Sequence, residues 1–126
     1  MASKKPSKTQ LFAKVRALAL SFPDATERPS HGAPAFFVGK KQFAVIVDNH
    51  HGDGKVAIWA AAPEGAQEML IDSEPAHFFR PAYVGHLGWV GVEIDKAPWS
   101  SVASVLESAY QARAPKPKAR RRSTGR

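Results

Sequence analysis

Residues 35–47 read AFFVGKKQFAVIV, with an apolar run on each side of Gly39, Lys40 and Lys41. Short runs of β-branched and aromatic residues that flank a glycine-containing turn are typical of a β-hairpin. The sequence therefore predicts two antiparallel strands joined near residue 40, with both lysines exposed at the tip of the turn.

Two further apolar runs extend the predicted sheet. Residues 56–60 (VAIWA) follow a polar turn at 48–55, and residues 89–94 (WVGVEI) alternate along their length. Val90, Val92 and Ile94 share one face of this strand, because successive side chains of a strand point to opposite sides. Between the two runs, a proline and an early acid at residues 63–72 indicate a short helix.

A helix is predicted at each end of the folded region. Ser7 and Gln10 have the spacing of a capping box, Pro23 ends the first helix, and Pro98 opens the last one. Apolar residues recur at helical spacing in both segments, and we expect them to face the sheet. They are Leu11, Val15, Leu18 and Phe22 in the first helix, and Trp99, Val102, Ala103, Leu106 and Tyr110 in the last.

These elements predict the α+β class. We expect a two-layer sandwich in which the N- and C-terminal helices pack on one antiparallel sheet, with the short helix between strands. A chain of 126 residues and 13.7 kDa suits one core. We place that domain at residues 7–114. Residues 1–6 and 115–126 are basic and lack apolar periodicity, so we expect both segments to be disordered.

The positive charge of the chain is concentrated at its ends. The formal net charge is +7, but residues 1–10 carry three cations and residues 113–126 carry seven, with no acid in either segment. Residues 11–112 hold eight cations and all eleven carboxylates, a net charge of −3. The basic C-terminal tail is therefore the strongest sequence signal for a polyanionic partner.

Composition also excludes several classes of protein. The chain has no cysteine, which removes disulfides, thiolate nucleophiles and cysteine-ligated metals. Its first apolar stretch, residues 11–22, is interrupted by Lys14 and Arg16 and is shorter than the roughly 20 residues that span a bilayer. We expect a cytoplasmic monomer without a membrane partner.

Several motifs occur in a shared order over residues 9–116: His31-Gly-Ala-Pro-Ala-Phe36, residues 38–44, residues 81–85 with 88–92, and residues 108–110 with 114–116. In these motifs the chain resembles the MmcQ/YjbR family. The resemblance implies a fold similar to the CyaY/frataxin arrangement and a DNA-binding role. Frataxin-like iron binding is not expected, because it needs a ridge of carboxylates and residues 8–22 contain no acid. No metal or other cofactor is expected.

The leading functional hypothesis is a non-enzymatic protein that binds DNA with weak sequence specificity. Phosphate contacts position such a protein and release counterions, whereas base edges confer specificity. The candidate residues are Lys40, Lys41 and Arg80 in the domain, with Lys116, Lys118, Arg120, Arg121 and Arg122 in the tail. Phe37, Trp59, Tyr83 and Trp89 fall on predicted strands or their edges. They can serve either as a base-stacking face or as core, and the sequence leaves both open.

The alternative hypothesis is a small-ligand or protein-interaction module with a pocket near His31, Tyr83 and Trp89. An enzyme is a further alternative, but no recognisable triad accompanies His31, and no catalytic residue is proposed. The cluster at residues 48–53 contains two acids and His50-His51. Asp, Asn and Gly are also the residues that tight turns require, so we interpret it as a turn and not as a metal site.

Overall fold

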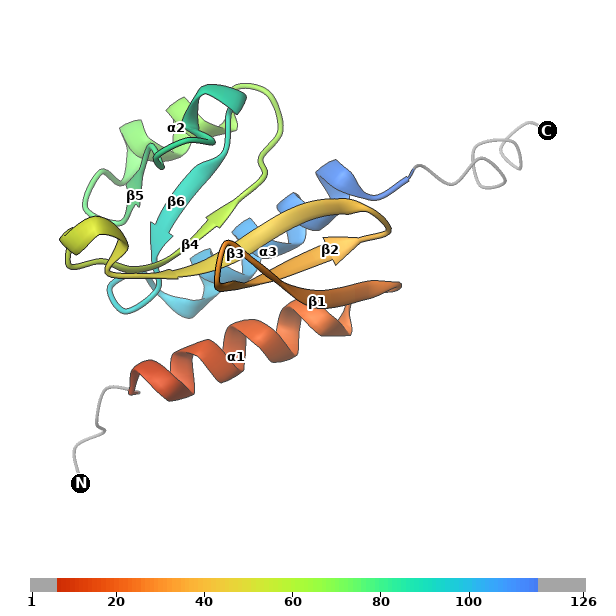
Figure 1. Ribbon diagram of the computed structural model, residues 1–126. Helices are drawn as coiled ribbons and strands as arrows, with labels where there is room; N and C mark the ends of the chain where they lie inside the picture. The colour runs from red at the N-terminus through yellow and green to blue at the C-terminus, as the bar shows by residue number, and fades with distance from the viewer. Residues whose placement is uncertain (1–6, 116–126) are drawn as a thin grey trace.

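The computed structural model describes residues 7–115, in which six strands form one antiparallel sheet of order β1-β2-β3-β4-β6-β5 (Figure 1). The strands are β1 (Ala25–Ser30), β2 (Ala33–Val38), β3 (Lys41–Asp48), β4 (Val56–Ala60), β5 (Phe78–Phe79) and β6 (Val90–Glu93). The α-helices are α1 (Lys8–Ser21), α2 (Ala66–Ser73) and α3 (Trp99–Arg113), and the short 3-10 helices are η1 (His50–Gly52) and η2 (Gly85–Leu87). This architecture confirms the predicted α+β sandwich. The segments 1–6 and 116–126, with all five tail residues proposed for DNA binding, lie outside the described residues.

The capping box predicted at the start of α1 is confirmed. The Ser7 Oγ accepts from the Gln10 amide at 3.1 Å, and the Gln10 Oε1 accepts from the Ser7 amide at 2.8 Å. These bonds satisfy two groups that the first turn of a helix leaves unpaired. The helix ends at Ser21, before Pro23, and it buries Leu11, Val15 and Ala19.

Helix α3 begins after Pro98, as predicted, but its buried stripe differs from the predicted one. Val102, Val105, Leu106 and Ala109 are buried, whereas Trp99 is only half-buried, with the Lys14 Nζ 4.4 Å from its ring centroid. Val105 and Ala109 thus belong to the stripe in addition to the predicted residues, and Trp99 packs against the core only in part. It lies in the first turn of the helix, where one side of its ring packs beneath the Lys14 side chain.

The edge strands β1 and β5 were not predicted from the sequence. Strand β1 (ATERPS) is polar and contains a proline, which edge strands tolerate because one side of their backbone is unpaired. It is anchored by an ion pair in which the Arg16 Nε donates to the Glu27 Oε1 at 2.8 Å and Nη2 donates to Oε2 at 3.1 Å. The hydrogen bond to Glu27 raises the pKa of Arg16, and the ion pair links α1 to β1.

A β-bulge in β3 determines which residues face each side of the sheet. Phe36 pairs with Ala44 and Phe37 with Gln42, so Phe43 is the extra residue between the two pairs. The Phe43 ring packs against Phe22 and Tyr110, which belong to the helical layer. Because Phe43 and Ala44 are both buried, Gln42 and Val45 are left for the opposite face of the sheet.

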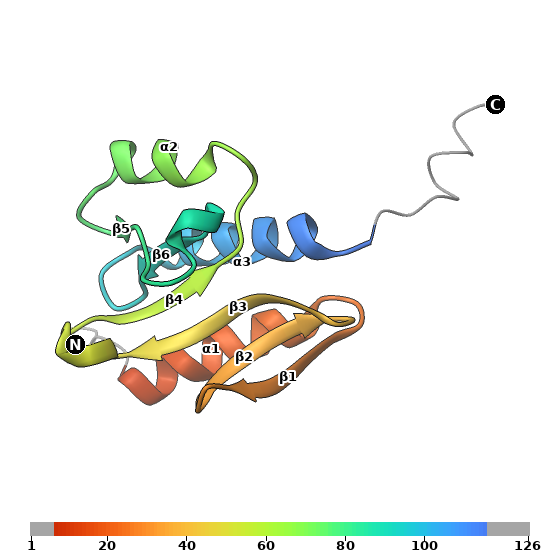
Figure 2. The ribbon, with the colours of Figure 1, turned by 45° about the horizontal axis from the view of Figure 1, so that its top comes forward.

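The opposite face, called here the open face, is not covered by α1 or α3. In Figure 2 strands β1, β2 and β3 lie in front of α1, so the viewer looks onto this face. Across it Val45 pairs with Trp59, and Trp59 pairs with Gly91. Gly91 is required there because an added Cβ would overlap the Phe79 ring, 2.7 Å from its Cε1. The loop between β5 and β6 covers part of the open face, and the space that is left between this loop and the sheet is the candidate site.

Candidate functional site

A cavity of about 570 Å³ lies on the open face and is called here the open-face cavity. Val45, Val47 and Trp59 form its floor on strands β3 and β4. The turn between β1 and β2 contributes His31, η1 contributes His50, and the loop before β6 contributes Tyr83 and Trp89. The structure thus brings together His31, Tyr83 and Trp89, the three residues of the sequence-based pocket hypothesis.

The turns around the cavity hold strained backbone conformations. His31, Asn49, His51 and Tyr83 have φ angles of 52°, 56°, 50° and 64°, in the left-handed region. Bulky residues rarely adopt this conformation, which costs of order 1–3 kcal/mol each for residues other than glycine. Within residues 7–115, five residues other than glycine have a left-handed backbone, and four of them lie in the turns at this end of the molecule. Such clustering is typical of functional sites.

An aromatic cluster closes one end of the cavity. The His50 ring centroid lies 4.1 Å from that of His51, 4.9 Å from Trp59 and 5.5 Å from Tyr83, each in an edge-to-face arrangement. The Tyr83 hydroxyl is 3.1 Å from the His51 Nε2, within hydrogen-bond distance. Tyr83 is 68% exposed, so its ring covers His50 from the solvent side and is held by one surface hydrogen bond.

Two residues that line the cavity each carry a buried polar atom without a hydrogen-bond partner. These atoms are the His50 Nε2 and the Trp59 Nε1, which contact no donor or acceptor of residues 7–115. Each such atom costs about 1–3 kcal/mol, since folding removes its bonds to water without replacing them. Trp59 is only 7% exposed, so the free-energy cost of its unpaired N–H arises in the middle of the sheet.

Among the described residues, no Asp, Glu, Lys or Arg lines the cavity. Its polar groups are hydroxyls, imidazoles, two indoles and the Gln42 amide. Within residues 7–115 no group of three or more His, Asp or Glu side chains is arranged to hold a metal ion. The cavity therefore offers neutral polar groups on an apolar surface, which is the usual composition of a small-molecule site.

The cations proposed for DNA binding are only partly brought together. Lys40 and Lys41 are exposed at the turn between β2 and β3, where Gly39 has a φ of 61°. The Arg113 Nε donates to the Gln42 carbonyl at 3.2 Å, so the end of α3 lies beside this turn (Figure 1). Lys40, Lys41 and Arg113 are called here the basic corner.

Arg80 does not belong to the basic corner. It follows β5, which strands β6 and β4 separate from β3. Its guanidinium lies against α2, with Nη1 3.4 Å from the Gln67 Oε1, and its aliphatic part packs on Gly85. Arg80 is exposed, but it and the hairpin lysines do not form one patch.

The four aromatic residues do not form an exposed stacking platform. Trp59 and Trp89 are 7% and 8% exposed, and the Phe37 ring is covered by the Arg28 guanidinium at 3.9 Å. Tyr83 alone of the four is well exposed. These rings therefore serve as core and cavity wall.

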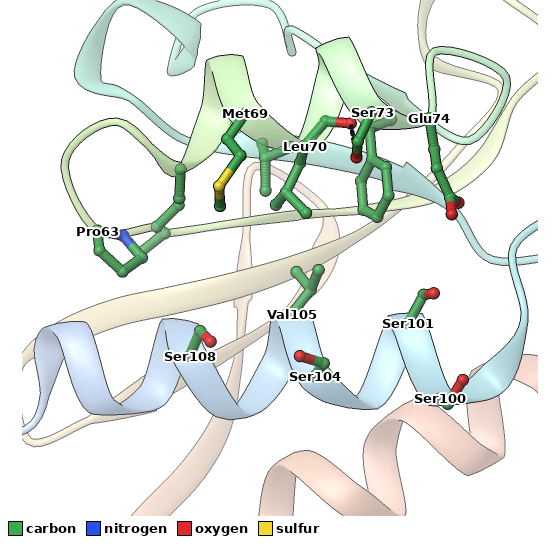
Figure 3. Close-up of a pocket in the computed structure, with 15 residues that line it drawn as sticks. Pro63, Met69, Leu70, Ser73, Glu74, Ser100, Ser101, Ser104, Val105 and Ser108 are labelled. Atoms are coloured by element: carbon green, nitrogen blue, oxygen red, sulfur yellow. Dashed lines mark hydrogen bonds between the residues drawn. The ribbon is translucent and has the colours of Figure 1, made fainter.

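A second hollow of about 430 Å³ lies between α2 and α3 (Figure 3). Met69 and Leu70 point into it from α2, and Val105 points toward them from α3, with Ser104 and Ser108 along the same helix. Neither unpartnered buried atom lies in this groove. The groove is therefore a weaker candidate than the open-face cavity.

None of the helices within residues 7–115 has the length and apolar character of a membrane span.

Comparison with known proteins gives a family match and a structural neighbour. The family model described as YjbR matches residues 20–112. The crystal structure of the Deinococcus radiodurans protein DR2400, with the family-model domain DUF419, is similar with a TM-score of 0.71 and 18% identity. The similarity covers 94% of this chain and 91% of that one, and at this identity it shows the fold alone. No protein with a curated description matches the chain significantly.

Proposed function

The chain belongs to the YjbR family, and we propose that it is a binding protein whose open-face cavity holds a small organic ligand. A shared fold does not determine function, so the proposal is argued from the cavity. The observation that carries it is the pair of buried, unpartnered atoms, the His50 Nε2 and the Trp59 Nε1, on two residues that line the cavity. A ligand that bonds to them recovers the free energy that the empty cavity loses.

Size and strain support the same proposal. The cavity of about 570 Å³ falls within the range of about 300–1,000 Å³ typical of sites for small molecules. The left-handed backbone at His31 and Tyr83 places their side chains at the cavity. No carboxylate lines the cavity to orient a catalytic imidazole. The arrangement therefore favours binding over catalysis.

Blocking the cavity tests this proposal. Ala33 is half-buried at the start of β2 and lines the cavity, so Ala33→Phe places a ring inside it. We expect Ala33→Phe to weaken the binding of 2-naphthoate and 2-naphthamide at least tenfold, as measured by isothermal titration calorimetry. Met69→Ala, in the groove between α2 and α3, is the control and should bind both probes as the wild type does. Failure of the wild type to bind either probe saturably would contradict the proposal.

A second candidate function is weakly sequence-specific DNA binding through the basic corner. One observation favours it: the end of α3 lies beside the turn that carries Lys40 and Lys41, and the basic sequence 116–126 continues from that end. The hairpin lysines therefore lie beside the helix end from which the basic sequence continues, and in this proposal both segments contact phosphates. Such contacts give affinity without reading bases.

Charge removal at the basic corner tests DNA binding. We expect Lys40→Gln with Lys41→Gln to weaken binding equally for two unrelated duplexes and to reduce the salt dependence, since each phosphate contact contributes about 0.9 to the slope of log K against log salt. Lys55→Gln with Lys96→Gln removes the same charge at the opposite end of β3 and should have little effect. Equal effects of the two pairs in electrophoretic mobility shifts would rule out a binding role for the corner.

A further inference from the structure

The chemistry of the open-face cavity indicates the class of its ligand. This step rests on the proposed function: we infer that the open-face cavity binds a small molecule with a carboxylate and a flat apolar ring system. Its carboxylate would bind between Trp59 and His50, and its body would lie along β3. The inference follows from the hydrogen-bonding properties of the two unpartnered atoms, the charge of the surroundings and the shape of the wall.

The Trp59 Nε1 requires a hydrogen-bond acceptor, and the His50 Nε2 requires one in the tautomer that carries its proton. An indole nitrogen only donates, so the missing partner of the Trp59 Nε1 must be an acceptor. The rings of Trp59 and His50 pack edge to face, with centroids 4.9 Å apart, so the two unpartnered atoms belong to neighbouring side chains. Imidazole Nε2 donates in the tautomer that carries its proton there, and in that tautomer both side chains offer a donor to the oxygens of a carboxylate.

The surroundings favour an anion over a neutral acceptor. Three of the five histidines in the sequence, His31, His50 and His51, lie in the cavity or against its cover, and no acid lines it. A hydrogen bond from an N–H group to an ionised carboxylate is charge-assisted and stronger than one to a neutral carbonyl. Because these side chains form no metal-binding group within residues 7–115, an organic anion is the partner that suits them.

The rest of the cavity fits a flat apolar group. Beyond His50 the wall consists of Val45, Val47, Val84 and Trp89. Gln42 lies at the far end, since it and Val47 are near opposite ends of β3. A ring system can therefore extend along β3 in contact with aliphatic and aromatic carbon, while its carboxylate stays at the His50 end.

Tyr83 must move for the carboxylate to reach its donors. The His50 Nε2 and the Trp59 Nε1 are buried, and the Tyr83 ring packs on the His50 ring with centroids 5.5 Å apart. The Tyr83 ring is exposed and is held by the contact of its hydroxyl with the His51 Nε2. Opening of this one contact is enough to admit a ligand, so Tyr83 acts as a cover over the carboxylate end.

A matched pair of probes tests the inference. We expect calorimetry on the full chain to show 2-naphthoate binding at least tenfold more tightly than 2-naphthamide, which has the same shape without the charge. His50→Phe should abolish this preference while keeping an aromatic ring beside Trp59 and Tyr83. Trp59→Phe should weaken both probes, and Trp99→Phe, remote from the cavity on α3, should change neither. Circular dichroism and thermal melting check that each variant folds.

The outcomes separate the ligand class from the site itself. If the amide binds as tightly as the acid, the carboxylate class is wrong, although the cavity remains a binding site. If His50→Phe keeps the preference for the acid, the carboxylate is not held by His50 and the inference is overturned. If neither probe binds the wild type, both the inference and the proposed function are overturned.

Discussion

Phe43→Ala is expected to lower the free energy of unfolding by about 3–5 kcal/mol, the range for removing a large aromatic side chain from a core. Phe43 is fully buried and is the extra residue of the β-bulge. Its ring lies 5.7 Å from that of Tyr110 and 6.2 Å from that of Phe22, so the substitution leaves a cavity where α1, α3 and the sheet meet.

Urea denaturation measures this loss, with Gln42→Ala as the control. Gln42 is the neighbouring residue in β3, but its side chain faces the open-face cavity. The control should stay within about 1 kcal/mol of the wild type, because half-exposed polar side chains contribute little to stability. A similar small loss for Phe43→Ala would show that the bulge does not direct Phe43 into the core. The assignment of Gln42 and Val45 to the open face would then fail too.

Leu106→Ala is expected to cost about 2–5 kcal/mol, as is usual for a buried leucine. Leu106 is fully buried on α3, the helix that packs against β3 and β4. Trp99→Ala, on the same helix, should cost clearly less, since Trp99 is half-buried and its contact with Lys14 contributes about 0.5–1 kcal/mol. Denaturation of both variants in urea decides this. A loss of stability for Trp99→Ala as large as that for Leu106→Ala would show that Trp99 belongs fully to the buried stripe, as helical spacing predicts.

The elements that could be predicted from the sequence are those fixed by local chemistry. The Ser7–Gln10 capping box and the turn at Gly39 depend on neighbouring residues. The alternation at 90–94 predicted a strand, although β6 is buried on both faces. Strand β1 could not be predicted, because ATERPS has no apolar run and is a strand only through its pairing with β2. The bulge at Phe43 likewise depends on contacts with α1 and α3.

The candidate site could be predicted only in part. His31, Tyr83 and Trp89 were identified as a pocket, and the structure places all three in one cavity. His50 was interpreted as part of a turn and not of a metal site, and Trp59 as part of either a stacking face or the core. Their role depends on the pairing of β3 with β4 and on the fold of the loop above them. The contact between His50 and Trp59 joins residues on different elements, so it cannot be recognised from the spacing of residues within one segment.

The two candidate functions use adjoining parts of the molecule. Gln42 lines the open-face cavity through its side chain, and its carbonyl accepts from Arg113 of the basic corner. A ligand that reaches Gln42 therefore lies next to the segment from which the basic tail continues. Both functions can coexist, and the variants proposed above test them separately.

The most direct test of ligand binding in the open-face cavity follows the indole N–H signals of the three tryptophans in a ¹H–¹⁵N correlation spectrum. Each signal is assigned from the spectrum of a single Trp→Phe variant. We expect 2-naphthoate to shift the Trp59 signal downfield and saturably, because its unpartnered Nε1–H gains an acceptor, while the Trp99 signal stays in place. A Trp59 signal that does not move at saturating 2-naphthoate, or a shift confined to Trp99, would contradict the proposed site.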